Sequence, residues 1–313
     1  MSVKRMALFC VAAAVSVQAH ADYQCDVGIS WLSGSIDMGG GSYYVPPGEY
    51  VPPETDDPEP PVGGEMPTIP TTPPASSGDE DYDGWAVTGR YYFAPVDTSH
   101  GPIDLAPFIT RSSSVGGQYG RLETDETDLE TSFWDADVRL VIASRWVLEA
   151  ELGGREVDEL GADTDIDLYR AAVGYYVGET TEVKVSVDRE DADFEDYDRW
   201  SVQVNHVTTF ENGMTWQARA LLGNVTGDHD LWRDVDGTDI EIDMSFYFNS
   251  RLGVGAKYSA KDRGDAGDID AHELWANYFV TDKLSLALSY YSEDHDGRDL
   301  ESDGIVFAAK YKI

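Results

Sequence analysis

The chain has 313 residues, with 59 Asp and Glu against 22 Lys and Arg, and a formal net charge of -37 at pH 7. A chain this acidic repels phosphate-bearing surfaces, which excludes nucleic acid and anionic membrane surfaces as expected partners. Of its two cysteines, Cys10 lies in a segment that we expect to be removed, so the mature chain holds only Cys25 and no intrachain disulfide.

The N-terminus has the features of a secretory signal peptide. Two basic residues precede an apolar run over 6–17, and Ala19-His20-Ala21 offers a small-residue cleavage site. The run of about 12 residues is too short for a membrane helix, which needs roughly 20. We therefore expect residues 1–21 to be a signal peptide. No later run is long and apolar enough for such a helix, so the mature chain, 22–313, is either a soluble secreted protein or an outer-membrane barrel.

Residues 22–34 alternate apolar and polar side chains and predict a first strand. An acidic, proline-rich segment follows over 39–81, and most of the 14 prolines of the chain fall within 46–74. Proline removes ladder donors and the acids repel one another, so we expect an extended, disordered external loop or insertion. A recognition segment for a partner is the alternative.

From residue 83 onward, apolar and polar side chains alternate with a period of two in one segment after another. Such segments are typical of strands with one apolar and one polar face. Counting the weak, Gly-rich third one, about 14 strands are predicted, at 22–34, 83–93, 109–122, 134–142, 146–152, 169–176, 183–188, 200–205, 216–222, 240–248, 252–258, 273–280, 284–290 and 305–313.

The links between these segments alternate in length. Short links such as 144–145 and 281–283 are followed by longer acidic links such as 158–165 and 223–238. Outer-membrane barrels have tight periplasmic turns and longer external loops. The fold class predicted is therefore all-β: a transmembrane antiparallel up-and-down β-barrel of about 14 strands (12–16), with both termini periplasmic and the Pro-rich segment as external loop 1. The link over 94–107 is an exception, because it is long where a tight turn is expected.

The closing segment alternates most clearly. Ile305, Phe307 and Tyr311 share one face, and Lys310 and Lys312 share the other. The ending resembles the C-terminal signature of bacterial outer-membrane proteins, although that signature usually ends in Phe or Trp rather than in Ile. The resemblance implies that the barrel-assembly machinery recognises this strand.

A second resemblance lies near the start of the barrel. The segments Arg90-Tyr-Tyr-Phe-Ala-Pro-Val96, Gly101-Pro-Ile-Asp-Leu-Ala-Pro-Phe-Ile109 and Arg111-Ser-Ser-Ser-Val115 resemble the early stretch of the Gram-negative "putative porin" family. This resemblance implies an outer-membrane barrel that gives passive diffusion to small hydrophilic solutes or ions, with outer-membrane lipid around it. It names no solute, and the segment over 39–80 is longer than is usual in the family.

We expect function on the polar face. Charged groups facing a filled core are costly, whereas water in a lumen removes most of that cost. Basic and acidic walls would then oppose each other across the lumen, although cross-strand salt bridges that only hold register are the alternative. Besides Asp188, the predicted lumen-lining residues are Arg90, Asp135, Asp137, Arg139, Glu149, Glu151, Arg170, Lys184, Arg219, Glu241, Asp243, Lys257, Glu273, Lys310 and Lys312.

Signals for catalysis or cofactors are weak, and we expect no enzyme, no cofactor and no defined metal site. His229 and His295 lie beside acids, but no serine with nucleophile spacing accompanies them. The acidic stretches lack the spacing of a calcium loop, so they predict only loose cation association. The acids concerned are Asp228, Asp230, Asp234, Asp236, Asp294 and Asp296.

Two alternatives to the channel, and the oligomeric state, stay open at this point. The barrel is either a channel or a non-channel surface protein that displays its acidic loops to a partner, and a soluble secreted β-sandwich is the third hypothesis. An apolar outer face has the same sequence pattern whether it meets lipid or another subunit, so a monomer and a homo-oligomer are both compatible with it.

Overall fold

The structure is a computed structural model, and it describes residues 23–38, 79–124, 130–159, 162–192, 195–229, 235–262, 268–295 and 300–313. The expected signal peptide over 1–21 lies outside the described residues. The same holds for the Pro-rich segment over 46–74.

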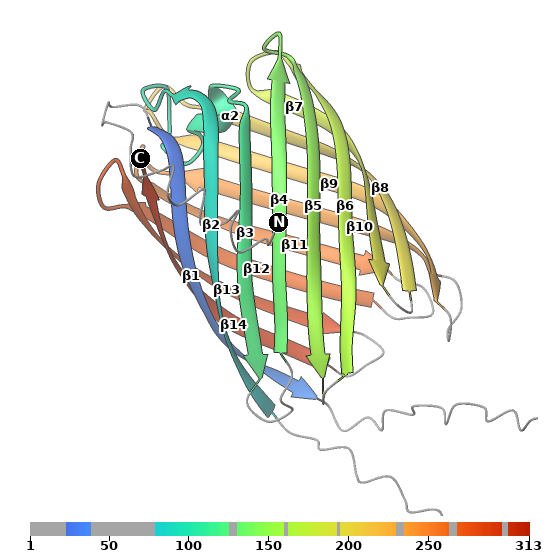
Figure 1. Cartoon of the computed structure of the whole chain (residues 1–313). Helices are drawn as coiled ribbons and strands as arrows, with labels where there is room; N and C mark the ends of the chain where they lie inside the picture. The colour runs from blue at the N-terminus through green and yellow to red at the C-terminus, as the bar shows by residue number, and fades with distance from the viewer. Residues whose placement is uncertain are drawn as a thin grey trace, which may run out of the picture.

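Fourteen antiparallel strands form a closed barrel in which each strand pairs with its neighbours in sequence and β1 pairs with β14 (Figure 1). This confirms the predicted fold class, and the soluble β-sandwich is wrong because the sheet closes on itself. The strands are β1 (Tyr23–Met38), β2 (Asp79–Val96), β3 (Ser114–Thr124), β4 (Glu130–Ile142), β5 (Trp146–Glu159), β6 (Ala162–Val177), β7 (Thr181–Ala192), β8 (Glu195–Thr209), β9 (Thr215–His229), β10 (Val235–Tyr247), β11 (Leu252–Asp262), β12 (Asp268–Phe279), β13 (Leu284–His295) and β14 (Leu300–Lys312).

The period-two pattern explains the exposure of the side chains. On β12, for example, Leu274 is 61% exposed and Tyr278 is 50% exposed, whereas the alternate residues Glu273 and Trp275 are half-buried. The same alternation exposes large apolar side chains on the outer face of most strands. A surface of this kind matches hydrocarbon rather than water, as in transmembrane barrels.

The two ends of the chain close the barrel. Val27 of β1 lies opposite Tyr311 of β14, and the pairing runs over most of both strands. At the last residue, the backbone N–H of Ile313 donates to the carbonyl of Cys25 at 2.7 Å, and the N–H of Gln24 donates to the carbonyl of Ile313 at 2.8 Å. The C-terminal strand is therefore the element that seals the sheet.

Short links join the strands at the end of the barrel that also holds Tyr23 and Ile313, which we call the short-turn end. These links cover 143–145, 178–180, 210–214, 248–251 and 280–283. Several types of tight turn need a residue with positive φ, and Gly178 (φ +76°) and Gly213 (φ +81°) have this conformation in two of these links.

At the other end, the strands are longer than predicted. The prediction places acidic links over 158–165 and 223–238, but the ladder continues to Glu159 of β5 and to His229 of β9. A strand that leaves the hydrocarbon can be polar on both faces and still keep its ladder hydrogen bonds. Polarity alone therefore marks the end of the apolar band and not the end of the strand.

The segment between β2 and β3 is the main departure from regular barrel geometry. The predicted third strand begins at residue 109, but the structure places the short helix α2 (Ala106–Ile109) there, and β3 begins only at Ser114. The long link over 94–107 was the one exception to the predicted alternation of link lengths. It contributes to an ordered element that we call the plug, residues 97–113.

No helix in the described part of the chain has the length and apolar character needed to cross a membrane.

Candidate functional site: the barrel interior

Charged side chains of non-neighbouring strands meet on one face of the sheet. Arg90 of β2 forms a bidentate pair with Asp137 of β4, at 2.7 and 2.8 Å. Arg199 of β8 lies 3.2 Å from Asp239 of β10. In each case one strand lies between the partners, and only the concave face of a curved sheet brings their side chains close. This geometry directs the charged residues towards the barrel axis.

Arg139 is the centre of the first half of this network. Its guanidinium contacts the carboxylates of both Glu149 on β5 and Glu182 on β7, and it donates to the hydroxyl of Tyr176 at 3.0 Å. The other oxygen of Glu149 accepts a hydrogen bond from the ammonium of Lys184 at 2.6 Å. Each charge therefore has a partner of opposite sign.

The second half continues the pattern on β6 to β11. The carboxylate of Asp188 lies 3.1 Å from Arg170 and 3.3 Å from Arg199. Arg219 lies 3.0 Å from Glu241, and Lys257 lies 2.9 Å from the other oxygen of the same carboxylate. We call these four groups of paired side chains together the charge ladder: Arg90, Asp137, Arg139, Glu149, Arg170, Glu182, Lys184, Asp188, Arg199, Arg219, Asp239, Glu241, Asp243 and Lys257.

The arrangement corrects one expectation. Basic and acidic residues do not form opposing walls, because on β2 to β11 they alternate and pair with one another. In each salt bridge the long side chain of an Arg or Lys reaches a carboxylate on the same or another strand, and such charge-assisted hydrogen bonds are stronger than neutral ones. Whether these residues line a water-filled pore stays a prediction.

The remaining predicted residues lie outside the ladder. Asp135 is hydrogen-bonded to Gln118, and Glu151 is 3.9 Å from Arg170. The ammonium of Lys312 lies 3.8 Å from the centroid of the Tyr23 ring. Three of these predicted residues have side chains that take part in no ion pair or hydrogen bond among the described residues: Glu273, Lys310 and Lys312.

Sequence reasoning missed several members of the interior. Glu182, Arg199 and Asp239 are not among the predicted residues, because each stands one residue before the start of a predicted strand. The period of two continues through all three positions, and this is the signal that extends each strand by one residue to include them. Tyr176 ends the predicted strand 169–176, but its contact with Arg139 depends on a strand pairing that the sequence does not give.

The plug crosses the mouth of the barrel at the short-turn end. Leu105 packs in an apolar cluster with Val207 of β8 and Tyr247 of β10. Phe108 of α2 packs against Tyr176 of β6, with ring centroids 5.5 Å apart. On another side, Ala106 lies in a cluster with residues of β1 and β2. Because these strands lie on different sides of the barrel, the plug spans its cross-section, and Figure 1 shows α2 at this end.

Polar contacts fix the plug to the short turns. Arg111 donates to the carbonyl of Ser144 at 2.5 Å and to that of Gly178 at 2.8 Å. The N–H of Ile103 donates to the carbonyl of Ser250 at 3.0 Å. The plug begins at Asp97, whose pKa is lowered because the side chain and backbone N–H of Ser99 donate to its carboxylate.

The acids predicted to associate loosely with cations are dispersed. Asp228, Asp236 and Asp294 belong to strands, whereas Asp230, Asp234 and Asp296 lie outside the described residues. In the part of the chain that the structure describes, no three His, Cys, Asp or Glu side chains are placed to hold a metal ion. Loose cation association therefore stays a prediction.

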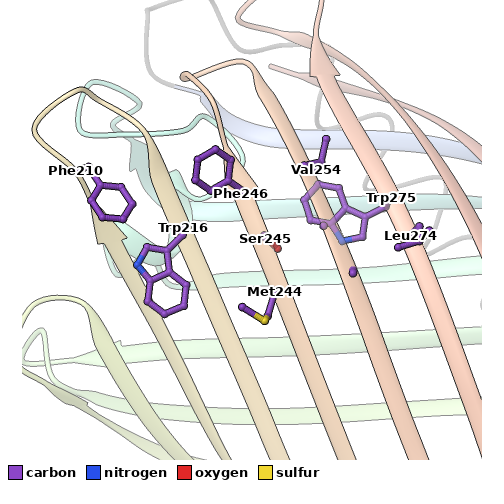
Figure 2. A pocket seen from close by; sticks show the side chains of 10 residues that line it. Phe210, Trp216, Met244, Ser245, Phe246, Val254, Leu274 and Trp275 are labelled. Atoms are coloured by element: carbon purple, nitrogen blue, oxygen red, sulfur yellow. The ribbon is translucent and has the colours of Figure 1, made fainter.

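The outer face carries a hollow of a different character. It has a volume of ≈ 670 Å³ and is lined by side chains of β9 to β12 and of the turn before β9, including Phe210, Trp216, Met244 and Leu274 (Figure 2). Its lining is apolar apart from Ser245. It therefore offers no partner to an ionic solute, which leaves the interior as the candidate site.

Comparison with known proteins agrees with this geometry. A family model described as "putative general bacterial porin" matches residues 75–309. A search of curated proteins finds no match.

Among solved structures, the outer-membrane protein Omp33 of Acinetobacter baumannii is similar over 94% of this chain and 100% of its own, with 16% identity and a TM-score of 0.54. A FadL homologue of Pseudomonas aeruginosa matches 92% of this chain and 90% of its own, with 10% identity and a TM-score of 0.49. An anion-selective porin from Comamonas acidovorans matches 92% of this chain and 98% of its own, with 7% identity and a TM-score of 0.43. The likeness to Omp33 supports the barrel fold, and the family match covers well over half of the chain. The protein therefore belongs to the family described as "putative general bacterial porin", which points to an outer-membrane channel rather than to an enzyme.

Proposed function

We propose that this protein is an outer-membrane porin that gives small hydrophilic solutes or ions passive diffusion through a water-filled lumen. The observation that carries the proposal is the charge ladder on the concave face. Fourteen charged side chains from nine strands occupy that face, whereas the convex face is apolar.

The energetics of this face favour water in the lumen. Desolvating an ion costs several kcal/mol even when the ion is paired. Several ladder members are only partly buried: the side chains of Arg90, Arg219 and Lys257 are each about one-third exposed, at 34%, 34% and 33%. Barrels of about 8 strands fill with side chains and those of 16 to 18 leave an aqueous channel, so one of 14 strands leaves a narrower path.

The orientation in the membrane follows from the same proposal. Outer-membrane barrels place tight turns in the periplasm, so the short-turn end, with Tyr23 and Ile313, is periplasmic. The acidic ends of the strands are then external. Residues 1–21 act as the signal peptide, and the sealing strand β14 is the segment that the barrel-assembly machinery recognises.

The plug favours a second candidate function. Because it spans the short-turn mouth, the closed barrel also suits a non-channel surface protein that displays its acidic end to a partner. The charge ladder argues for the channel, since a purely structural barrel gains nothing from a partly exposed interior of paired charges. Solutes then pass beside the plug or when it moves.

Single-channel recording of the refolded protein tests the proposal. We expect discrete conductance steps in planar bilayers, which a barrel acting only as a display scaffold does not give. The control is a preparation that has not folded, recognised by the loss of its heat-dependent gel shift. A folded barrel that is silent, both as the full chain and after residues 98–109 are replaced by a short Gly-Ser link, would contradict a channel function.

A further inference from the structure

Glu273 differs from the other charged residues near the middle of the interior. Among the described residues it takes part in no ion pair or hydrogen bond, although Lys257 lies directly opposite it on β11. The ammonium of Lys257 is instead 2.9 Å from Glu241. The carboxylate of Glu273 is therefore available to a solute.

Two aromatic side chains flank this carboxylate on the same face. Trp275 is two residues further along β12, and it reaches into the barrel, where it packs against Tyr247 with ring centroids 6.3 Å apart. Tyr291 lies directly opposite Glu273 on β13. Its hydroxyl contacts that of Tyr82 on β2, which is not a neighbouring strand, so it too points inward. Directly opposite side chains have Cβ atoms about 5 Å apart, which puts ring and carboxylate within reach of one solute group.

The charged side chains near Glu273 on β9 to β12 carry an excess of negative charge. Arg219 and Lys257 carry two positive charges. Against them stand three carboxylates, of Glu241, Asp243 and Glu273, and the first two of these bind the two cations. One negative charge is left, and it belongs to Glu273.

A free positive charge lies on the same face, but at a distance. Lys310 is directly opposite Ser285, which is six residues before Tyr291 on β13. At about 3.4 Å per residue the separation along the strand is roughly 20 Å. The Debye length at physiological ionic strength is about 8 Å, so Lys310 does not cancel the field at Glu273.

From this arrangement we propose that Glu273, Trp275 and Tyr291 form a selectivity site for organic cations that carry an ammonium group. The carboxylate supplies the counter-charge, and the electron-rich ring faces attract the same cation. The proposal rests on the proposed function, because it names the class of solute that this channel favours. Inorganic cations gain the charge interaction but less from the rings, whereas neutral isosteres gain neither.

Choline is the probe, and its uncharged isostere, in which a carbon replaces the quaternary nitrogen, is the matched neutral compound. The test variant is Glu273→Gln, which keeps side-chain volume and removes the charge. The control variant is Glu156→Gln, the same substitution on the outer face of β5. Retention of the heat-dependent gel shift shows that both variants fold.

Two readouts keep the outcomes distinct. Choline is expected to bind the refolded protein by isothermal titration calorimetry and to block its potassium current. Glu273→Gln is expected to weaken both about tenfold, as befits the loss of a charge-assisted contact, and Glu156→Gln is expected to weaken neither. Equal binding of choline by the wild type and by Glu273→Gln, or equal binding of choline and its isostere, would overturn the site while leaving the channel intact. A folded barrel that binds choline through Glu273 but never conducts would retain the site and refute the diffusion function.

Discussion

Among single residues, Arg139 binds three interior side chains, those of Glu149, Glu182 and Tyr176. It links β4 to β5 and β7, and through Tyr176 it reaches the plug, since the hydroxyl of Tyr176 also lies 3.3 Å from the carbonyl of Phe108. The side chain of Glu182 is only 4% exposed, and that of Arg139 is 20% exposed. The pair is therefore held where water cannot replace a lost partner.

This burial predicts unequal effects for two similar substitutions. Glu182→Gln leaves part of the Arg139 charge uncompensated and is expected to lower the free energy of unfolding by about 2–4 kcal/mol. Glu151→Gln is the matched control, because Glu151 is 41% exposed and 3.9 Å from Arg170. Its expected effect is below about 1 kcal/mol. Urea unfolding in detergent micelles, followed by tryptophan fluorescence, measures both. Equal losses would show that the Arg139 network does not contribute in the way its burial implies.

At the scale of elements, the plug is held by contacts of two kinds. Apolar residues such as Leu105 and Phe108 pack on the inner wall, and Arg111 binds the carbonyls of two neighbouring short turns. The guanidinium also lies over the ring of Tyr176, at 4.6 Å from its centroid. Arg111 thus fastens the end of the plug that leads into β3.

Removing this attachment is expected to open the channel more often. In Arg111→Ala the plug loses its hydrogen bonds to the carbonyls of Ser144 and Gly178, while its apolar packing is kept. Planar-bilayer recordings should therefore show a severalfold rise in open probability. Arg145→Ala is the control, because Arg145 lies in a short turn and its guanidinium donates to the hydroxyl of Tyr175 at 3.1 Å and not to the plug. A rise of the same size in both variants, or none in Arg111→Ala, would argue against the plug as the obstruction.

The strands were predictable because their energetics are local, whereas the plug was not. A strand with one apolar and one aqueous face shows a period of two within its own sequence. This local pattern predicted the number of strands and the face of the sheet on which Arg139 and Lys184 lie. The plug mixes Gly, Pro and apolar residues, and Leu105 gains its stability from Val207, about a hundred residues away. No pattern within the segment carries that information.

The interior shows the same division between local and distant information. The alternation placed Arg90 and Asp137 on the polar face, but not their pairing, which depends on the curvature of the closed sheet. The sequence likewise does not show that Glu273 lacks an ion-pair partner among the described residues. Lys257 lies directly opposite it in register, but its ammonium binds Glu241 instead. Register alone thus predicts which charges are near one another and not which of them bind.

At the scale of the whole molecule, acidic residues of neighbouring strands lie directly opposite one another at the end of the barrel away from the short turns. Asp167, Asp191 and Asp196 lie directly opposite one another on three successive strands. Asp270, Asp294 and Glu301 do the same on β12 to β14. Like charges in direct opposition destabilise a sheet unless counter-ions gather around them. This rim therefore concentrates cations at the mouth that we propose to be external.

A rim of this kind predicts a cation preference that depends on salt. At 0.01 M ionic strength the Debye length is about 30 Å, so the rim acts across the whole mouth, whereas at 1 M it is about 3 Å and the rim is screened. Reversal potentials measured across the same concentration ratio of potassium chloride should favour potassium over chloride, strongly at low salt and weakly at high salt. Substituting Asp191 and Asp196 by Asn should reduce the preference at low salt and leave the high-salt value unchanged, because that residual value comes from the interior. A preference for chloride, or one that is constant across this range of salt, would show that the acidic rim does not control which ions enter.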